Sequence, residues 1–142
     1  MPMLKNTVQV EIEWGDCDPA EIVYYPNYFR WFNYGAHKLF DAAGLPFHRL
    51  IKDRGTLGVP LLDAHATFLA PVRFGDVIAV TSEVREWRNR SFVVAHQIHN
   101  GDVLSVEGQE IRAWAIRDPD SPRGIRAVPV PEEIKRRLSA AG

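Results

Sequence analysis

The chain opens with alternating apolar and polar residues. From residue 8 to residue 14 glutamine or glutamate stands between apolar side chains, which are Val8, Val10, Ile12 and Trp14. A period of two predicts a half-buried β-strand. The run Gly-Asp-Cys-Asp-Pro at residues 15–19 ends this strand, because proline cannot continue a hydrogen-bonded ladder.

The apolar period becomes that of a helix after Pro26. Apolar residues then share one helical face, namely Phe29, Phe32, Ala36, Leu39, Phe40 and Ala43. Proline suits the first turn of a helix, and Gly44 suits its C-terminal end. We therefore predict a helix over residues 26–43, about 27 Å long, whose aromatic stripe packs against a sheet. Trp31 and Tyr34 lie off this stripe and suggest a second buried surface, for example between subunits.

Strand patterns fill most of the rest of the chain, after a short helical or irregular piece near residues 47–54. The predicted strands span about 60–69, 76–87, 91–99, 103–116 and 125–128, and a last helix spans 131–138. Asn100-Gly101 predicts a two-residue hairpin turn, and residues 118–124 predict a loop. One strand, one long helix and then antiparallel strands indicate an α+β layer architecture, in a single domain over residues 1–142. Pairing with another subunit is one way to cover the edge strands of such a sheet.

Composition narrows the possible partners. Apolar residues make up 46% and charged residues 25%, which is typical of a soluble globular protein. The net charge of −1 gives no basic excess that would indicate nucleic acid. The single cysteine, Cys17, allows no intrachain disulfide, and no Cys/His spacing resembles a metal site. Neither a secretory segment nor a membrane-spanning run is visible, so we expect a cytoplasmic protein without cofactor, metal or membrane partner.

Two carboxylates, Asp16 and Asp18, stand between the first strand and the long helix. Aspartate often caps helices or makes turns, which is the simpler interpretation of each one alone. The start of the helix adds a second possibility, because its first backbone N–H groups lack internal partners and carry the positive end of the helix dipole. Such a group can stabilise an oxygen that gains negative charge during acyl transfer. A carboxylate and an oxyanion site could therefore lie a few residues apart.

Other nucleophile systems have less support in the sequence. Cys17 is the only thiol, and His37 lies on a helix twenty residues away. Ser91 lies on or near a strand and lacks a Gly-x-Ser-x-Gly elbow. Neither a dinucleotide fingerprint nor a phosphate loop is present. The five histidines show no metal-ligand spacing on a helix, although His65 could line a pocket.

Three arginines, Arg85, Arg88 and Arg90, surround Trp87. Guanidinium groups bind phosphates through paired hydrogen bonds, so this cluster suits a ligand that carries a nucleotide. A solvated turn between two strands explains it equally well on composition alone.

Three segments resemble the 4-hydroxybenzoyl-CoA thioesterase family. The specific one is Glu-Trp-Gly-Asp-Cys-Asp-Pro-Ala-Glu-Ile-Val-Tyr-Tyr-Pro-Asn-Tyr at residues 13–28, and residues 70–76 and 86–93 are similar as well. The resemblance runs in order from about residue 8 to residue 130. It implies the hotdog fold, in which a curved antiparallel sheet wraps a long helix. It also implies hydrolysis of acyl-CoA in a dimer whose sheets join side by side, often paired again into a tetramer, with active sites at the dimer interface.

The resemblance also implies roles for individual residues. Asp18 would be the catalytic carboxylate, acting either as a nucleophile on the thioester carbonyl or as a general base for water. The backbone N–H of Tyr25 would polarise the carbonyl oxygen. The positions that would meet the nucleotide phosphates of coenzyme A are Arg88, Arg90 and Ser91. The candidates for the acyl pocket are Tyr24, Asn33 and Val59.

Three of these positions depart from the family pattern. Glu21 stands where glycine is usual, so a positive φ there would cost about 1–2 kcal/mol, and its charge would lie near Asp18. We expect Glu21 to tune activity rather than abolish it. Asn33 replaces an acid, and Val59 replaces a residue that can carry a hydroxyl, in the relatives specific for hydroxybenzoyl groups. Such a pocket is less equipped to bind a para-hydroxyl, so we expect an aromatic or short- to medium-chain acyl group.

Two other functions stay open. A hotdog module that binds acyl-CoA without turnover would be expected to lack a working carboxylate. A hotdog hydratase or dehydratase usually has a histidine and an acidic residue near the helix start, and this sequence shows no such pair there.

Overall fold

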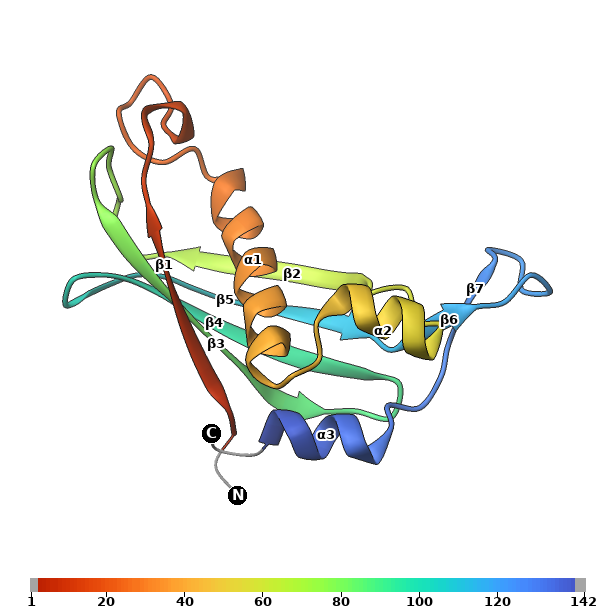
Figure 1. Ribbon diagram of the computed structural model, residues 1–142. Helices are drawn as coiled ribbons and strands as arrows, with labels where there is room; N and C mark the ends of the chain where they lie inside the picture. The colour runs from red at the N-terminus through yellow and green to blue at the C-terminus, as the bar shows by residue number, and fades with distance from the viewer. Residues whose placement is uncertain (1–2, 140–142) are drawn as a thin grey trace.

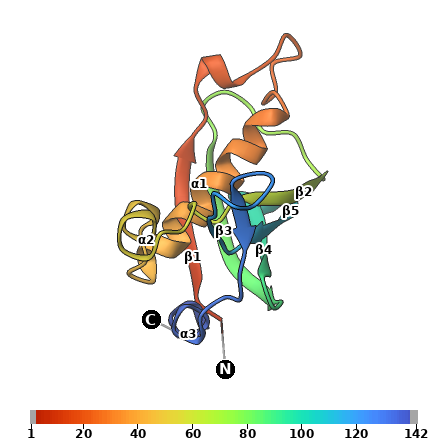
Figure 2. The same cartoon turned by 90° about the vertical axis from the view of Figure 1, so that its right-hand side faces the viewer.

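The structure is a computed structural model and describes residues 3–139. A five-stranded antiparallel sheet, in the order β1-β3-β4-β5-β2, curves around one long helix, α1 (Figures 1 and 2). The five strands are β1 (Lys5–Glu11), β2 (Leu61–Phe68), β3 (Val77–Trp87), β4 (Ser91–Asn100) and β5 (Val103–Ala113). The helices are η1 (Trp14–Asp16), α1 (Pro26–Ala42), α2 (Phe47–Arg54) and α3 (Glu132–Ser139). A separate pair, β6 (Ala115–Arg117) and β7 (Ile125–Ala127), lies between β5 and α3 in the chain.

The predicted order of elements is confirmed, and two boundaries are corrected. The first strand was predicted over residues 8–14, whereas β1 ends at Glu11 and the exposed Trp14 begins a 3₁₀ turn. The turn forms because the Asp16 carboxylate accepts a hydrogen bond from the Glu13 backbone N–H, which withdraws that amide from a ladder. The strand predicted over residues 103–116 is divided into β5 and β6 at Trp114.

The core lies between α1 and the inner face of the sheet. Most of the predicted stripe is buried there, with Phe32, Ala36, Leu39 and Phe40 inaccessible to water. Trp31 is also buried, against Tyr28 and the residues around β1, so the second surface that it indicated lies within the chain rather than between subunits. Tyr34 remains 42% exposed.

The two edges of the sheet differ in their side chains. On β1 the exposed positions alternate with half-buried ones and include Lys5 and Glu11. On β2 most positions are exposed, and apolar side chains are among them: Leu61, Leu62 and Phe68 are each about half exposed. Natural proteins normally protect such an edge with charge or with a partner, so β2 is the edge that lacks cover. Within residues 3–139, no helix has the length and apolar character needed to cross a bilayer.

Candidate active site

A small hairpin precedes α1 and holds Asp18 at its turn. The backbone N–H of Asp18 donates to the Ile22 carbonyl at 2.9 Å, and Cys17 bridges Val23 in antiparallel fashion. The Glu21 N–H donates to the Asp18 carbonyl at 2.8 Å and closes the turn. This turn forces Glu21 into the left-handed region, with φ of 67°. The positive φ considered from the sequence is therefore present, on a residue other than glycine.

The two carboxylates of this loop have different hydrogen-bond partners. Asp16 uses both oxygens, one for the Glu13 N–H at 2.9 Å and one for the Arg30 guanidinium at 3.1 Å. Asp18 accepts only one hydrogen bond, on Oδ1 from the Ala20 N–H at 2.9 Å. Its Oδ2 meets no donor among residues 3–139. Both carboxylates therefore have the structural role of shaping a turn, Asp16 with both oxygens and Asp18 with one. Asp18 alone keeps a carboxylate oxygen without a donor among residues 3–139.

Asp18 faces a cavity of about 520 Å³. The cavity is lined by Trp14, Cys17, Asp18, Pro19, Glu21, Arg73 and Phe74. Trp14 and Phe74 meet edge to face, with 5.5 Å between ring centroids, and form an apolar wall. The only thiol lies here, but His37 lines a different cavity, so the structure does not bring the Cys–His pair considered above together.

The start of α1 offers a free hydrogen-bond donor beside this hairpin. Tyr24 follows the second strand of the hairpin and donates its N–H to the Asp16 carbonyl at 2.9 Å. Tyr25 is the N-cap of α1, and its own N–H has no acceptor in the described part of the chain. Pro26 has no N–H to compete for an incoming oxygen. The unpaired amide predicted at Tyr25 is therefore present, a few residues from Asp18. The side chains of both tyrosines are more than half exposed.

The candidate nucleotide-binding residues lie at the opposite end of the sheet. β3 begins at Val77, which pairs with Glu11 next to the Asp18 hairpin, and ends at Trp87, just before Arg88. Ten steps along an antiparallel strand span about 33 Å. Arg88 and Ser91 form the β3–β4 turn through an N–H···O=C bond of 2.8 Å, and Arg88 pairs with Glu86 at 2.6 Å. Within one chain, Asp18 therefore lies far from Arg88, Arg90 and Ser91.

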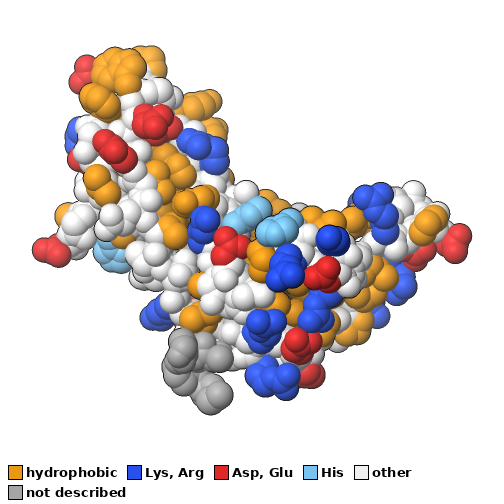
Figure 3. Space-filling model, in the orientation of Figure 1, with side chains coloured by type: hydrophobic (Ala, Val, Ile, Leu, Met, Phe, Trp, Pro, Cys, Tyr) orange, Lys and Arg blue, Asp and Glu red, His pale blue; other side chains and the backbone are white. Residues whose placement is uncertain are grey.

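Basic side chains gather in the same half of the molecule as this turn. Figure 3 shows lysine and arginine over α2, α3 and the β6–β7 end, with few at the tip that the loop before α1 forms. Exposed residues of that region include Arg49, Lys52, Arg123, Arg136 and Arg137. This half of the surface suits an anionic ligand better than the half with Asp18 does.

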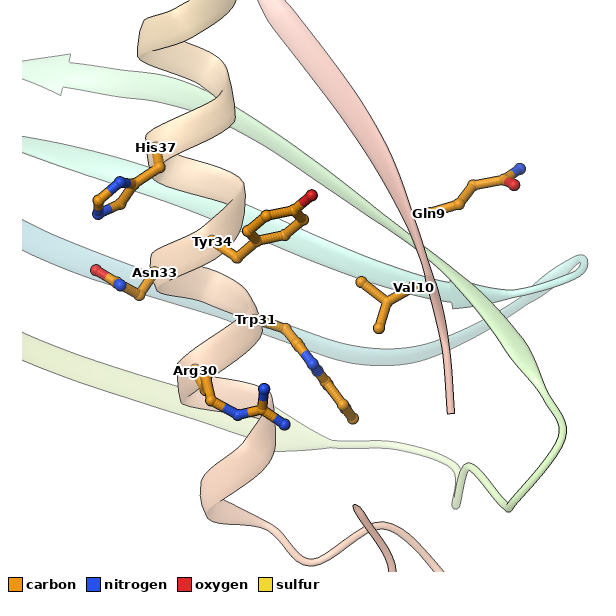
Figure 4. A pocket seen from close by; sticks show the side chains of 7 residues that line it. All are labelled: Gln9, Val10, Arg30, Trp31, Asn33, Tyr34 and His37. Carbon is orange, nitrogen blue, oxygen red and sulfur yellow. The ribbon is translucent and has the colours of Figure 1, made fainter. Parts of the chain in front are cut away.

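Asn33 lines a second cavity, of about 480 Å³, which is bordered by α1 and by Gln9 and Val10 of β1. Figure 4 shows Asn33 and His37 on one side of the helix, and Trp31 and Tyr34 directed toward β1. Partial burial lowers the pKa of His37 below 6.5, and the positive charge of Arg112 lowers it further. Val59 is fully buried in the core, with φ of 53°, so its side chain reaches neither cavity.

A polar cluster in the core joins these two pocket candidates. The guanidinium of Arg112 donates to the Asn33 amide oxygen at 2.9 Å and to the Val59 carbonyl at 3.1 Å. Arg112 is paired in turn with Glu110. Burial alone would raise the pKa of Glu110, but the hydrogen bond from His96 and the charge of Arg112 outweigh it, so this pKa lies below 4.5.

No motif in the sequence singles out this cluster. The available signal was a polar residue on the apolar side of three strands: Ser82 between Val80 and Val84, His96 between Val94 and Ile98, and Glu110 with Arg112 on the next strand. His65, which could have lined a pocket, does line a shallow one on the outer face of the sheet, with Thr67 and Gln97.

Comparison with known proteins gives concordant matches. The model of the Thioesterase-like superfamily matches residues 12–138. A 4-hydroxybenzoyl-CoA thioesterase of Pseudomonas sp. (strain CBS-3) is 37% identical over 133 residues, which cover 89% of this chain and 92% of that protein.

Two solved structures extend this similarity. One is a 4-hydroxybenzoyl-CoA thioesterase with an aspartate-to-asparagine substitution, complexed with 4-hydroxybenzoyl-CoA; it is 35% identical, has a TM-score of 0.85, and the match covers 95% of this chain and 99% of that one. The other is a gentisyl-coenzyme A thioesterase, 26% identical with a TM-score of 0.79, and the match covers 95% of this chain and 100% of that one.

Proposed function

This chain belongs to the thioesterase-like superfamily, has the hotdog fold and is an acyl-CoA thioesterase, and we propose that it cleaves thioesters of aromatic acyl groups with Asp18 as the catalytic carboxylate. One observation carries the choice of residue. A carboxylate with a free oxygen, on Asp18, and a free amide, on Tyr25, belong to one small hairpin and the helix start that it leads into. The relative with an asparagine in place of an aspartate and its acyl-CoA bound supports a catalytic aspartate in this family.

Two reaction routes fit this arrangement. In the first, a carboxylate oxygen of Asp18 attacks the thioester carbon, coenzyme A leaves as the thiolate, and water then hydrolyses the mixed anhydride. In the second, Asp18 takes a proton from water, which attacks the carbon directly. In both, negative charge develops on the carbonyl oxygen, and the Tyr25 N–H donates a hydrogen bond to it. Neither route needs a metal or a cofactor.

The complete site is proposed to form between two subunits. Phe68, at one end of β2, packs near Tyr25, with 6.4 Å between ring centroids. Leu61, at the other end, pairs with Arg112, and Arg112 pairs with Phe92 next to Ser91. If β2 pairs antiparallel with its own copy about a two-fold axis, Phe68 of one chain lies beside Leu61 of the other. The Asp18 end of one subunit then faces the end of the partner that carries Arg88, Arg90 and Ser91.

This dimer would also cover the exposed apolar edge, since Leu61, Leu62 and Phe68 all lie on β2. Arg88, Arg90 and Ser91 would then bind the nucleotide phosphates, and Tyr24 and Asn33 would contact the acyl group. Pairing of two dimers into a tetramer, a cytoplasmic location and a single domain over residues 1–142 remain predictions from the sequence.

The test is release of free thiol from a panel of aromatic, medium-chain and short-chain acyl-CoA thioesters. Asp18→Asn should lower kcat by at least about 10²-fold while the Kd for acyl-CoA changes little. Asp41→Asn, which alters an exposed carboxylate on the far end of α1, is the matched control and should keep full activity. Full activity of Asp18→Asn would refute the assignment of the carboxylate. Tight binding of acyl-CoA without any hydrolysis by the natural chain would favour the binding module instead.

The hydratase or dehydratase alternative gains no support from the His–acid pair in the core. His96 and Glu110 are 1% and 2% exposed. Neither lines the cavity that contains Asp18. A substrate could not reach them without opening the core.

A further inference from the structure

A chain of buried polar side chains crosses the sheet beneath α1. Ser82 Oγ lies 2.7 Å from His96 Nδ1, and His96 Nε2 lies 2.8 Å from Glu110 Oε1. These residues come from β3, β4 and β5, and none is more than 2% exposed. Glu110 then binds Arg112 side-on, with Nε 3.2 Å from Oε1 and Nη2 2.8 Å from Oε2. The position of the guanidinium group is therefore fixed from three strands.

The helix α1 packs directly against these buried polar side chains. Phe32 stacks on the ring of His96, with centroids 4.7 Å apart and planes 4° from parallel. A Cβ on Gly35 would lie 2.5 Å from Ser82 Oγ, and one on Gly108 would lie 2.5 Å from the Phe32 ring. Only glycine allows so close an approach at these two positions, so the helix and the polar side chains form one tightly packed unit.

Arg112 reaches from this unit to the two acyl-pocket candidates. Its Nη1 donates to the Val59 carbonyl at 3.1 Å and its Nη2 to the Asn33 amide at 2.9 Å. With the two bonds to Glu110, four of its five N–H groups are engaged. The bond to Val59 holds a β-branched residue in the left-handed region, with φ of 53°.

The hydrogen bond from Arg112 to Asn33 fixes the orientation of the Asn33 amide group. A guanidinium group has donors and no acceptor, so the atom of Asn33 that faces it must be the amide oxygen. The amide NH₂ group is then the part of Asn33 left for a ligand, and it has no acceptor within residues 3–139. Asn33 is exposed and borders the cavity along α1 (Figure 4).

We propose that Arg112, held by Glu110, is a positioning residue that fixes Asn33 as a hydrogen-bond donor, and that the preferred acyl group carries an acceptor atom where it reaches Asn33. The inference rests on the proposed function, in which Asn33 contacts the acyl group. An amide that could rotate would accept or donate with equal ease and would not discriminate. An amide held by Arg112 rejects groups that offer only a donor or only carbon, because its NH₂ would be buried without a partner.

The test compares two ligands of nearly equal size. Non-hydrolysable S-phenacyl thioethers of coenzyme A that carry 4-methoxy or 4-ethyl differ in one oxygen, which only accepts hydrogen bonds. For the natural chain we expect the methoxy ligand to bind about threefold to tenfold more tightly, as one net hydrogen bond predicts. Asn33→Ala should bring the two Kd values together, and Asn33→Asp should reverse the preference.

Variants of Arg112 separate positioning from general stability. Arg112→Lys keeps the charge but cannot hold Glu110 and Asn33 with one planar fork, and Glu110→Gln/Arg112→Met removes both charges together. Each should lose most of the methoxy preference while still binding both ligands, whereas a purely structural role would weaken both ligands equally. If the double variant does not fold, Arg112→Lys and Asn33→Ala still decide the question.

Equal Kd values in the natural chain, or an unchanged preference in Arg112→Lys, would refute the inference. Thiol release from the corresponding benzoyl-CoA thioesters is measured in parallel. Its absence alongside a retained methoxy preference would refute the proposed hydrolysis and leave this inference standing.

Discussion

Replacement of Glu21 by glycine changes two properties of one residue, its backbone strain and its charge. The residue is held at φ of 67° by the turn that carries Asp18. Its side chain is exposed, borders the Asp18 cavity, and makes neither a hydrogen bond nor an ion pair among residues 3–139. Glu21→Gly therefore removes backbone strain and a negative charge, and Glu21→Gln removes the charge alone.

The backbone effect follows from the conformation. A left-handed conformation in a residue other than glycine lowers the stability of the folded chain by about 1–2 kcal/mol. Glycine at this position would remove that strain but would also stabilise the unfolded chain by about 0.5–1 kcal/mol through greater backbone freedom. The net stabilisation expected from Glu21→Gly is about 0.5–1 kcal/mol. The unfolding entropy of about 2.1 cal/mol/K per residue converts this into a rise of Tm of about 2–3 °C. Glu21→Gln keeps the strain and should leave Tm unchanged.

The charge effect follows from the shared cavity. At a separation on the order of 10 Å, two unit charges in water repel by about 0.4 kcal/mol. Because negative charge develops on the thioester oxygen during the reaction, loss of the Glu21 charge should raise kcat/KM about twofold in low salt. The gain should fall toward zero in about 1 M salt, where charges are screened beyond about 3 Å.

Calorimetry and thiol release on the natural chain and both variants separate the two effects. The pair Glu21→Gln and Glu21→Gly should match in rate and salt dependence and differ in Tm. Glu11→Gln, on the exposed face of β1, is the control for a surface charge. An unchanged rate and pH profile in Glu21→Gly would contradict a tuning role of Glu21, and a lower Tm in Glu21→Gly would contradict backbone strain at this position.

Two further predictions concern assembly and acid stability. Leu62→Glu puts a charge on the exposed β2 edge and should convert the proposed dimer to monomers in sedimentation, with loss of thiol release and a retained circular dichroism spectrum; an active monomer would exclude a site shared between subunits. Glu110→Gln should lower Tm at pH 7, because the pKa of Glu110 lies below 4.5 in the folded chain. The ionised group thus stabilises the fold fully above pH 4.5 and less as pH falls through the lowered pKa. The Tm difference from the natural chain should shrink below about pH 4, and a constant difference would contradict the linkage.

The sequence predicted the order of elements because periodicity is local. The apolar stripe from Phe32 to Phe40 and the alternation in β1 each report burial of one face, and the helix face is buried while that of β1 is half-buried. Hydrogen bonds from side chains to nearby backbone groups could not be predicted from the apolar periodicity. Trp14 continues the alternation of β1, yet the Asp16 carboxylate captures the Glu13 N–H and turns the chain there.

Contacts between segments that are distant in the sequence could not be predicted from the pattern of apolar and polar residues. Asp16 and Asp18 are the same residue type in the same loop and differ in their hydrogen-bond partners. The Asp16 carboxylate accepts a hydrogen bond from Arg30, which lies 14 residues later on α1. Arg112 contacts Asn33 and Val59 across separations of 79 and 53 residues. The resemblance pointed to Asn33 and Val59, but no spacing in the chain joins them to Arg112.

For the active site as well, the sequence predicted the local features but not how they are arranged in space. The sequence indicated both a carboxylate beside a helix start and an arginine cluster around Trp87, and the structure places them near opposite ends of β3, a strand whose length is about 33 Å. A coenzyme A thioester cannot be held by both within one chain unless the sheet itself is rearranged. The edge strand β2 runs between the same two ends and exposes apolar side chains along its length. Antiparallel pairing of β2 with its copy brings unlike ends together twice, so one interface would complete two identical sites and bury the edge that each chain leaves open.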